Sequence, residues 1–307
     1  MATILITGGT GMIGQHLTKM LISKGFEVIV LCRSLPKIIA NNCSYAKWNI
    51  DNNTIDIDAI KKADYIIHLA GANVAEKRWT DARKKEILES RTKSSNLIIK
   101  ALTENENKVI AVISASAIGW YGSDTKLQSY QFKEEDKPFD DFLGTTCKKW
   151  EDSILPVQQL HKRLVILRTG IVLCKAGGAL KEFLKPLQMG IATILGNGNQ
   201  KISWIHVTDL CNLFIFAIEN NTLKGVYNAV APMPVSNKAL VIELAKIVRN
   251  KFYIPIYVPS FFLKIILGEM SIEVLKSCTV SASKIEHAGF RFQFSTINDA
   301  LKNLITK

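Results

Sequence analysis

The sequence predicts an α/β fold in which a doubly wound parallel sheet carries a smaller, mainly helical C-terminal lobe. Short apolar runs alternate with amphipathic stretches over roughly the first two-thirds of the chain, and a glycine-rich turn follows the first run. The rhythm changes beyond about residue 173, where glycines cluster and helical patterns then dominate. Strands that alternate with helices are typical of a parallel sheet covered by helices on both faces.

Five apolar runs have the length and composition of buried strands. Between the first two, Ile13, Leu17 and Leu21 share one helical face, and Lys24-Gly25 predicts the end of that helix. Beyond residue 173 we expect a strand at 204–207, a helix that begins near Asp209 and a short strand at 256–259. The five expected sheet strands cover residues 3–7, 28–32, 65–69, 109–114 and 164–167.

The glycine-rich turn has the spacing of a dinucleotide-binding βαβ unit. Thr7 ends the first strand, and the G-x-x-G-x-x-G pattern follows it and opens the next helix. Glycines allow the tight turn, the approach of a pyrophosphate and the packing of helix on strand, while the helix N-terminus offers unpaired N–H groups. The sequence therefore predicts a Rossmann-type site at Gly8, Thr10, Gly11, Met12, Ile13 and Gly14.

The end of the second strand selects the cofactor. NAD-binding units place an acidic residue there, and its charge would repel a 2′-phosphate. This chain has Arg33 and Ser34 instead, which offer a charge-assisted fork and a hydroxyl to a phosphate. The pattern favours NADP(H); the alternative is a surface arginine at a strand end.

Charge and cysteine usage exclude several other classes of protein. The formal net charge is +12, but the basic residues are spread along the chain and often stand beside acids, so we expect no nucleic-acid partner. The six cysteines form no C-x-x-C pair, so we expect neither a metal site nor a disulfide framework.

The sequence also predicts a cytoplasmic protein without a membrane partner. A strand pattern begins at Thr3 and leaves no room for a targeting segment. The longest apolar stretch, residues 258–267, is broken by Pro259 and Lys264 and is too short to span a bilayer.

Further motifs accompany the glycine loop and together carry a resemblance that covers essentially the whole chain. They are residues 68–72, 78–80, 90–91, 114–122, 150–151, 168–170, 204–210, 227–232, 268–270 and 288–290. With them the chain resembles the extended short-chain dehydrogenase/reductases. More narrowly it resembles their atypical epimerase-family branch, whose members are often labelled nucleoside-diphosphate-sugar epimerases and carry a small C-terminal tail domain.

The resemblance implies roles for several residues. Cys32 and Arg33 would hold the adenosine ribose phosphate, and Val172 would lie near the nicotinamide. Glu86 and Arg91 match positions that face the cofactor in relatives; the alternative is a solvent-exposed ion pair on a charged helix. The strand end at Leu69, Ala70 and Gly71 would line the cofactor site through backbone groups. Residues 1–172 would form the NADP-binding domain, to whose sheet later segments can return, and residues 173–307 a smaller substrate lobe that includes the tail domain from about residue 256.

The proton-transfer set of the superfamily is incomplete. Active relatives pair a Tyr-x-x-x-Lys motif with a serine, because the lysine lowers the tyrosine pKa. Here Lys148 stands three residues before Glu151, but Gly144 precedes Lys148 by four residues and Thr145 precedes Lys149 by four. The expected tyrosine is absent.

The remaining catalytic candidates are Ser114 and Ser116, which could orient a substrate oxygen, Tyr121, and Lys148, which could hold the nicotinamide ribose. The alternative for Tyr121 is a packed loop aromatic, and we expect structural roles for His68 and His206.

Two functions therefore stay open. One is an NADP(H)-dependent oxidoreductase or epimerase that acts on a small carbonyl or hydroxyl compound, a sugar nucleotide included. The other is a catalytically degenerate NADP(H)-binding sensor. The substrate and the oligomeric state, a homo-oligomer included, stay open as well.

Overall fold

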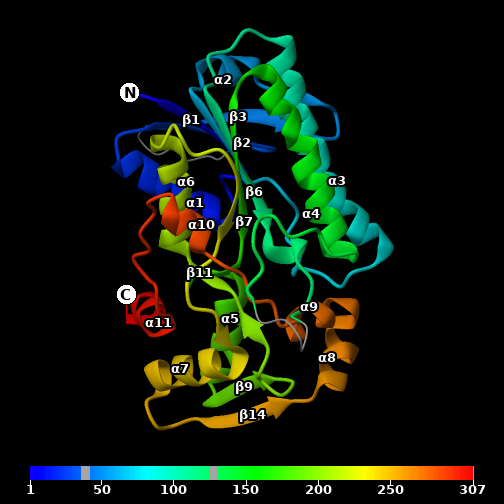
Figure 1. The fold of residues 1–307 in the computed structure, drawn as a ribbon, viewed down its shortest axis with the longest axis vertical. Coiled ribbons are helices and arrows are strands. Elements are labelled where there is room, and N and C mark those ends of the chain that lie inside the picture. The colour runs from blue at the N-terminus through cyan, green and yellow to red at the C-terminus, as the bar shows by residue number, and fades with distance from the viewer. Residues whose placement is uncertain (36–41, 125–129, 307) are drawn as a thin grey trace.

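The computed structural model describes residues 1–35, 42–124 and 130–306 and has an eight-stranded sheet at its centre (Figure 1). Its strands are Thr3–Thr7 (β1), Glu27–Cys32 (β2), Cys43–Asn49 (β3), Thr54–Ile55 (β4), Tyr65–His68 (β5), Ala111–Ala117 (β6), Arg163–Thr169 (β7) and Gly225–Ala229 (β12). Their order across the sheet is β12-β7-β6-β5-β1-β2-β3-β4. All neighbours run parallel except β3 and β4, which confirms the predicted fold class.

Helices cover both faces of this sheet, as Figure 1 shows. One face carries Met12–Ser23 (α1) and Val207–Glu219 (α6), and the other carries Ile57–Lys62 (α2), Asp81–Glu104 (α3) and Phe142–Ile154 (α4). Side chains alternate along β1, so that Ile4 and Ile6 enter the first core and Leu5 enters the second. Each face of the sheet therefore has its own apolar core.

The chain leaves the sheet after β7 and later returns to it. Ile171–Leu173 (β8) pairs with Trp204–His206 (β11), and α6 then leads back to β12 at the sheet edge. The remaining elements build the smaller lobe below the sheet in Figure 1, while Ser283–His287 (α10) packs beside β12. The lobe comprises Gly178–Leu187 (α5), Ile191–Leu195 (β9), Lys201–Ile202 (β10), Val235–Ser236 (β13), Asn237–Arg249 (α7), Ile254–Val258 (β14), Ser260–Leu267 (α8), Gly268–Met270 (η3), Ser271–Leu275 (α9) and Ile297–Thr306 (α11).

A buried hydrogen-bond relay joins the carboxyl ends of β1 and β5. The Thr7 hydroxyl oxygen accepts hydrogen bonds from the backbone N–H groups of Leu69 (3.1 Å) and Ala70 (3.2 Å). The hydroxyl therefore donates its own hydrogen bond to His68 Nδ1 at 2.7 Å. His68 Nε2 then carries a proton and donates it to Ser95 Oγ at 3.2 Å. His68 is thus a neutral structural group that fixes the strand end at residues 69–70.

Burial lowers the pKa of His68 to about 3, from an ordinary value of 6.5. Below pH 6.5 His68 is therefore protonated in the unfolded chain but stays neutral in the folded chain. The free energy of unfolding falls as the pH decreases from 6.5 toward 3. Between pH 6.5 and 4.5 this group alone should remove roughly 2–3 kcal/mol from the free energy of unfolding.

Urea unfolding at the two pH values measures this loss. His68→Gln should show a shallower pH dependence than the unchanged chain. His161→Asn should keep the full dependence, since His161 is exposed and its left-handed backbone (φ 56°) suits asparagine. Equal slopes for His68→Gln and the unchanged chain would contradict the assignment.

Candidate functional site

The glycine loop between β1 and α1 forms a cradle that admits no side chains. Gly8 has a φ of +68°, and a Cβ on it would lie 2.8 Å from the carbonyl carbon of Leu69. A Cβ on Gly14 would lie 2.4 Å from the Gly8 oxygen. Gly11 caps α1 without a side-chain hydrogen bond, and the first turn holds no acidic residue. The free N–H groups and positive end of α1 thus face a backbone cradle that fits a pyrophosphate.

The segment after β8 meets this cradle from the other side. A Cβ on Gly177 would lie 3.1 Å from Met12 Sδ, and one on Gly178 would lie 3.5 Å from the Val172 oxygen. Met12 and Val172 therefore lie at the same edge of the sheet, although they are far apart in the sequence.

The end of β2 presents one charged and one polar side chain. Cys32 is buried, and its thiol lies 3.7 Å from the Ala46 oxygen; burial raises the pKa of this thiol. Arg33 and Ser34 follow it and are exposed. In the described part of the chain Arg33 has no ion-pair partner, so its guanidinium is accessible to a phosphate.

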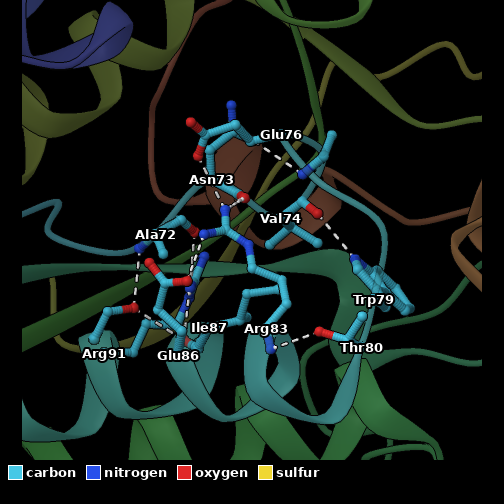
Figure 2. A network of polar contacts seen from close by, with 12 residues as sticks. Ala72, Asn73, Val74, Glu76, Trp79, Thr80, Arg83, Glu86, Ile87 and Arg91 are labelled. Atoms are coloured by element: carbon cyan, nitrogen blue, oxygen red, sulfur yellow. Dashed lines mark hydrogen bonds and ion pairs between the residues drawn. The ribbon is translucent and has the colours of Figure 1, made fainter.

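The loop at residues 72–80, which follows β5, is clamped onto α3 by Arg83 (Figure 2). The buried Arg83 guanidinium donates to the Asn73 oxygen (2.5 Å), to Glu76 Oε2 (3.0 Å) and to Glu86 Oε2 (2.7 Å). Thr80 caps α3 by accepting the Arg83 N–H at 3.2 Å. Glu86 is therefore the partner of the buried Arg83 and not of Arg91, so the structure does not form the exposed Glu86–Arg91 ion pair that was the alternative.

Arg91 lies behind the strand end at Gly71. Its Nη1 donates to the carbonyls of Ala72 (3.1 Å) and Ile87 (2.8 Å), and its guanidinium lies 4.9 Å from the centre of the Trp150 ring. A Cβ on Gly71 would lie 3.0 Å from Arg91 Cζ. Burial lowers the pKa of Arg91 to about 10, so it stays cationic, and no carboxylate of the described residues forms a salt bridge with it.

A buried ion pair between Glu151 and Arg168 forms hydrogen bonds with polar side chains near the ends of β6 and β7. Arg168 binds Glu151 with two hydrogen bonds of 2.8 and 3.0 Å, and Ser116 Oγ donates to Glu151 at 2.6 Å. Arg168 also donates to the Tyr121 hydroxyl at 3.0 Å and stacks on the Trp120 ring at 3.6 Å. These contacts join α4 to the neighbouring strands in a closed polar network.

The hydroxyls of Tyr121 and Ser114 also donate hydrogen bonds to partners inside the protein. The fully buried Tyr121 hydroxyl donates to Asn228 Oδ1 at 2.7 Å, and burial raises the tyrosine pKa well above its ordinary value. Ser114 is buried and donates to the Ala115 oxygen at 3.1 Å. The structure thus places the Ser116 and Tyr121 hydroxyls in one buried network around Glu151 and Arg168.

The inner face of α4 carries no Tyr-x-x-x-Lys pair. Lys148 lies on the outer face, where its side chain is 53% exposed and pairs with Asp152 at 2.6 Å. Gly144 cannot be replaced by a larger residue without a shift, because a Cβ there would lie 2.0 Å from the Phe139 oxygen. At the same spacing on the inner face stand Leu143 and Cys147, both packed on Gly119. The apolar spacing of residues 143, 147, 150 and 154 is a sequence signal that could have identified this face, which was not predicted from the sequence.

Cys147 is no replacement for the lysine. Burial, followed by the charge of Glu151, raises the pKa of its thiol to about 12 against a smaller opposing effect of Arg91. The thiol therefore stays protonated at neutral pH.

His206 has a structural role. Its Nδ1 accepts the Thr208 N–H at 3.0 Å and so caps α6, and its ring packs 4.0 Å from that of Phe294. Asp209, in the first turn of α6, accepts the backbone N–H groups of Gln293 and Phe294 at 2.9 Å each. These contacts attach the C-terminal segment to α6.

Residues 1–35, 42–124 and 130–306 contain no group of three histidine, cysteine or acidic side chains that could hold a metal ion. In the same residues no helix has the length and apolar character needed to cross a bilayer.

Comparisons with known proteins agree with this geometry. Residues 4–144 match the NAD dependent epimerase/dehydratase family, and residues 258–304 match a domain of unknown function. The chain is 35% identical over 310 residues to an epimerase family protein, SAR0825, of Staphylococcus aureus, with all of both chains covered. It is 33% identical to the epimerase family protein YfhF of Bacillus subtilis, covering 98% of this chain and 97% of the relative.

Solved structures include one of human epimerase family protein SDR39U1 with NADPH. It is 27% identical, covers 99% of both chains and has a TM-score of 0.86. The resemblance noted in the sequence, tail domain included, is confirmed.

Removing the charge of Glu151 should strongly destabilise the fold. Glu151→Gln leaves Arg168 as a buried cation without its counter-ion, which should cost about 3–5 kcal/mol in the free energy of unfolding. Asp152→Asn is the matched control one residue along, because its ion pair with Lys148 is exposed and should matter by less than about 1 kcal/mol. Urea denaturation measures both; equal effects would contradict the network.

Proposed function

The chain belongs to the epimerase family, and on that premise we propose that it binds NADP(H) at the carboxyl edge of its sheet and acts as a sensor of that cofactor. The observation that carries the proposal is the glycine cradle, in which the start of α1 has no side-chain cap and the close approach of Gly8, Gly14 and Leu69 leaves no room for further side chains. Helix N-termini of this kind bind phosphate groups.

The phosphate on the adenosine ribose is assigned to Arg33 and Ser34. Both are exposed directly after β2, and no acid stands there to hold a 2′-hydroxyl or repel a 2′-phosphate. Leu69 and Ala70, fixed by the relay through Thr7, would contribute backbone groups at the same edge. The NADPH in the human relative supports the choice of cofactor.

A sensing role follows from the state of the side chains around this edge. When bound, the cofactor can supply or accept a hydride. A dehydrogenase of the Tyr–Lys type also needs a hydroxyl that exchanges a proton near neutral pH. Ser116 and Tyr121 are committed to the buried network, and Lys148 faces solvent. The side chains at this edge therefore favour a protein that binds the cofactor without turning over a substrate, which is the property a sensor needs.

Arg91 favours a second candidate, an NADP(H)-dependent oxidoreductase or epimerase. A fixed cation beside the reacting carbonyl stabilises the oxyanion that forms during hydride transfer, so it can act where a proton donor is missing. Arg91 lies behind Gly71 at the sheet edge, and its charge is balanced by no carboxylate of the described chain. The substrate of such a reaction would be a small carbonyl or hydroxyl compound.

We assign the protein to the cytoplasm. All six cysteines are buried free thiols, which suits a reducing compartment.

Arg33→Ala should weaken NADPH binding by about tenfold or more and leave NADH binding nearly unchanged, because only NADPH carries the 2′-phosphate. Isothermal titration with both cofactors measures the ratio of the two affinities. Lys302→Ala, a change of charge on the distant α11, should leave that ratio as it is. An unchanged ratio in Arg33→Ala would show that the phosphate is held elsewhere.

The two candidate functions differ in turnover. The sensor should bind NADPH but not oxidise it in the presence of aldehydes, ketones or sugar nucleotides, as followed by NADPH absorbance. A compound that is reduced with saturation kinetics would refute the sensor. If Arg91→Met then abolished that activity while NADPH affinity stayed within about threefold, the oxyanion role of Arg91 would be supported.

A further inference from the structure

The tail helix α8 exposes an apolar face that no element of the described chain covers. Phe261, Phe262, Ile265 and Ile266 are 58%, 49%, 65% and 63% exposed. Residues one turn apart are neighbours on a helix, so these four form one continuous strip. Leu263 is buried on the opposite side, where α8 packs against η3 and α9. Figure 1 shows α8 at the outer margin of the lobe.

A further exposed apolar residue lies on the neighbouring helix α9. The rings of Phe261 and Phe262 lie 4.3 Å apart, and Ile272 on α9, which packs against α8, is also exposed. A contiguous exposed apolar surface of this kind is typical of a site that contacts another protein or a membrane.

The surroundings of the strip are basic. Lys264 is exposed on α8 itself, and the exposed Arg78 donates from Nη2 to the Ile265 oxygen at 2.5 Å. Lys77, beside Arg78, is exposed as well. The nearby acid Glu269 is neutralised by Lys84 at 2.5 Å.

We propose that the strip on α8 docks on an anionic lipid membrane. Its phenylalanines and isoleucines enter the boundary between headgroups and acyl chains, and Lys264, Arg78 and Lys77 contact the headgroup phosphates. A second copy of the chain fits less well, because the basic surroundings would meet their own like charge and each chain carries +12. The expectation of no membrane partner was drawn from the lack of a spanning segment, which does not bear on peripheral docking.

This inference is independent of the proposed function and is tested with a separate readout. The full chain is mixed with vesicles of phosphatidylcholine plus phosphatidylglycerol, or of phosphatidylcholine alone, and bound protein is measured by flotation. Binding should need the anionic lipid and weaken with added salt. The double variant Phe261→Gln/Ile265→Gln should bind about tenfold or more weakly. The midpoint of its urea unfolding should be unchanged, because both side chains are exposed, which shows that the variant is folded.

The matched control is Leu155→Gln, an exposed apolar residue after α4 on another part of the surface, which should bind vesicles as the unchanged chain does. Three results would overturn the proposal: no binding to anionic vesicles at low salt, equal binding by the double variant and the unchanged chain, or a dimer in sedimentation that the double variant turns into a monomer without any binding to vesicles. The last would assign the strip to a second copy of the chain.

Discussion

The buried ion pair between Glu151 and Arg168 is the constraint on which the chemistry of this sheet edge depends. Two charges removed from water are stable only when their remaining hydrogen-bonding atoms are also satisfied. In this chain the Ser116 and Tyr121 hydroxyls, together with the Trp120 ring, meet that need. The polar residues that could have served catalysis are thereby used to complete a structural network. That network, together with the apolar inner face of α4, is what supports the proposal of a cofactor-binding protein without a Tyr–Lys proton-transfer pair.

The cofactor cradle depends on a different set of contacts. Close approach of Gly8 to Leu69, and of Gly14 to Gly8, brings the start of α1 and the end of β5 together. The Thr7–His68 relay then fixes the direction of the backbone after β5, and Arg83 and Arg91 fix the loop that follows. These contacts are separate from the Glu151–Arg168 network, so the proposed cofactor binding does not depend on that network.

Much of the fold was predictable, because the glycine spacing and the apolar runs report local structure directly. The strand β3 was not located, since its side chains alternate between buried and exposed and form no apolar run. The site was less predictable, because it depends on which face of α4 meets the sheet. A shift of one residue, from Cys147 to Lys148, turns a side chain by about 100° around the helix and moves it from the core to solvent. Likewise, no local pattern reveals that Ser116 binds Glu151 and Tyr121 binds Arg168, the two members of one buried ion pair.

The central claim is that this sheet edge binds NADP(H) without a proton-transferring pair beside it. A crystal structure of the chain with NADPH tests it most directly. We expect the pyrophosphate against the N–H groups that begin α1, the 2′-phosphate on Arg33, and Leu143 and Cys147 on the helix face toward the site, with Tyr121 still bonded to Asn228. A structure in which Tyr121 or Lys148 hydrogen-bonds at the nicotinamide, or in which the 2′-phosphate lies away from Arg33, would contradict the account.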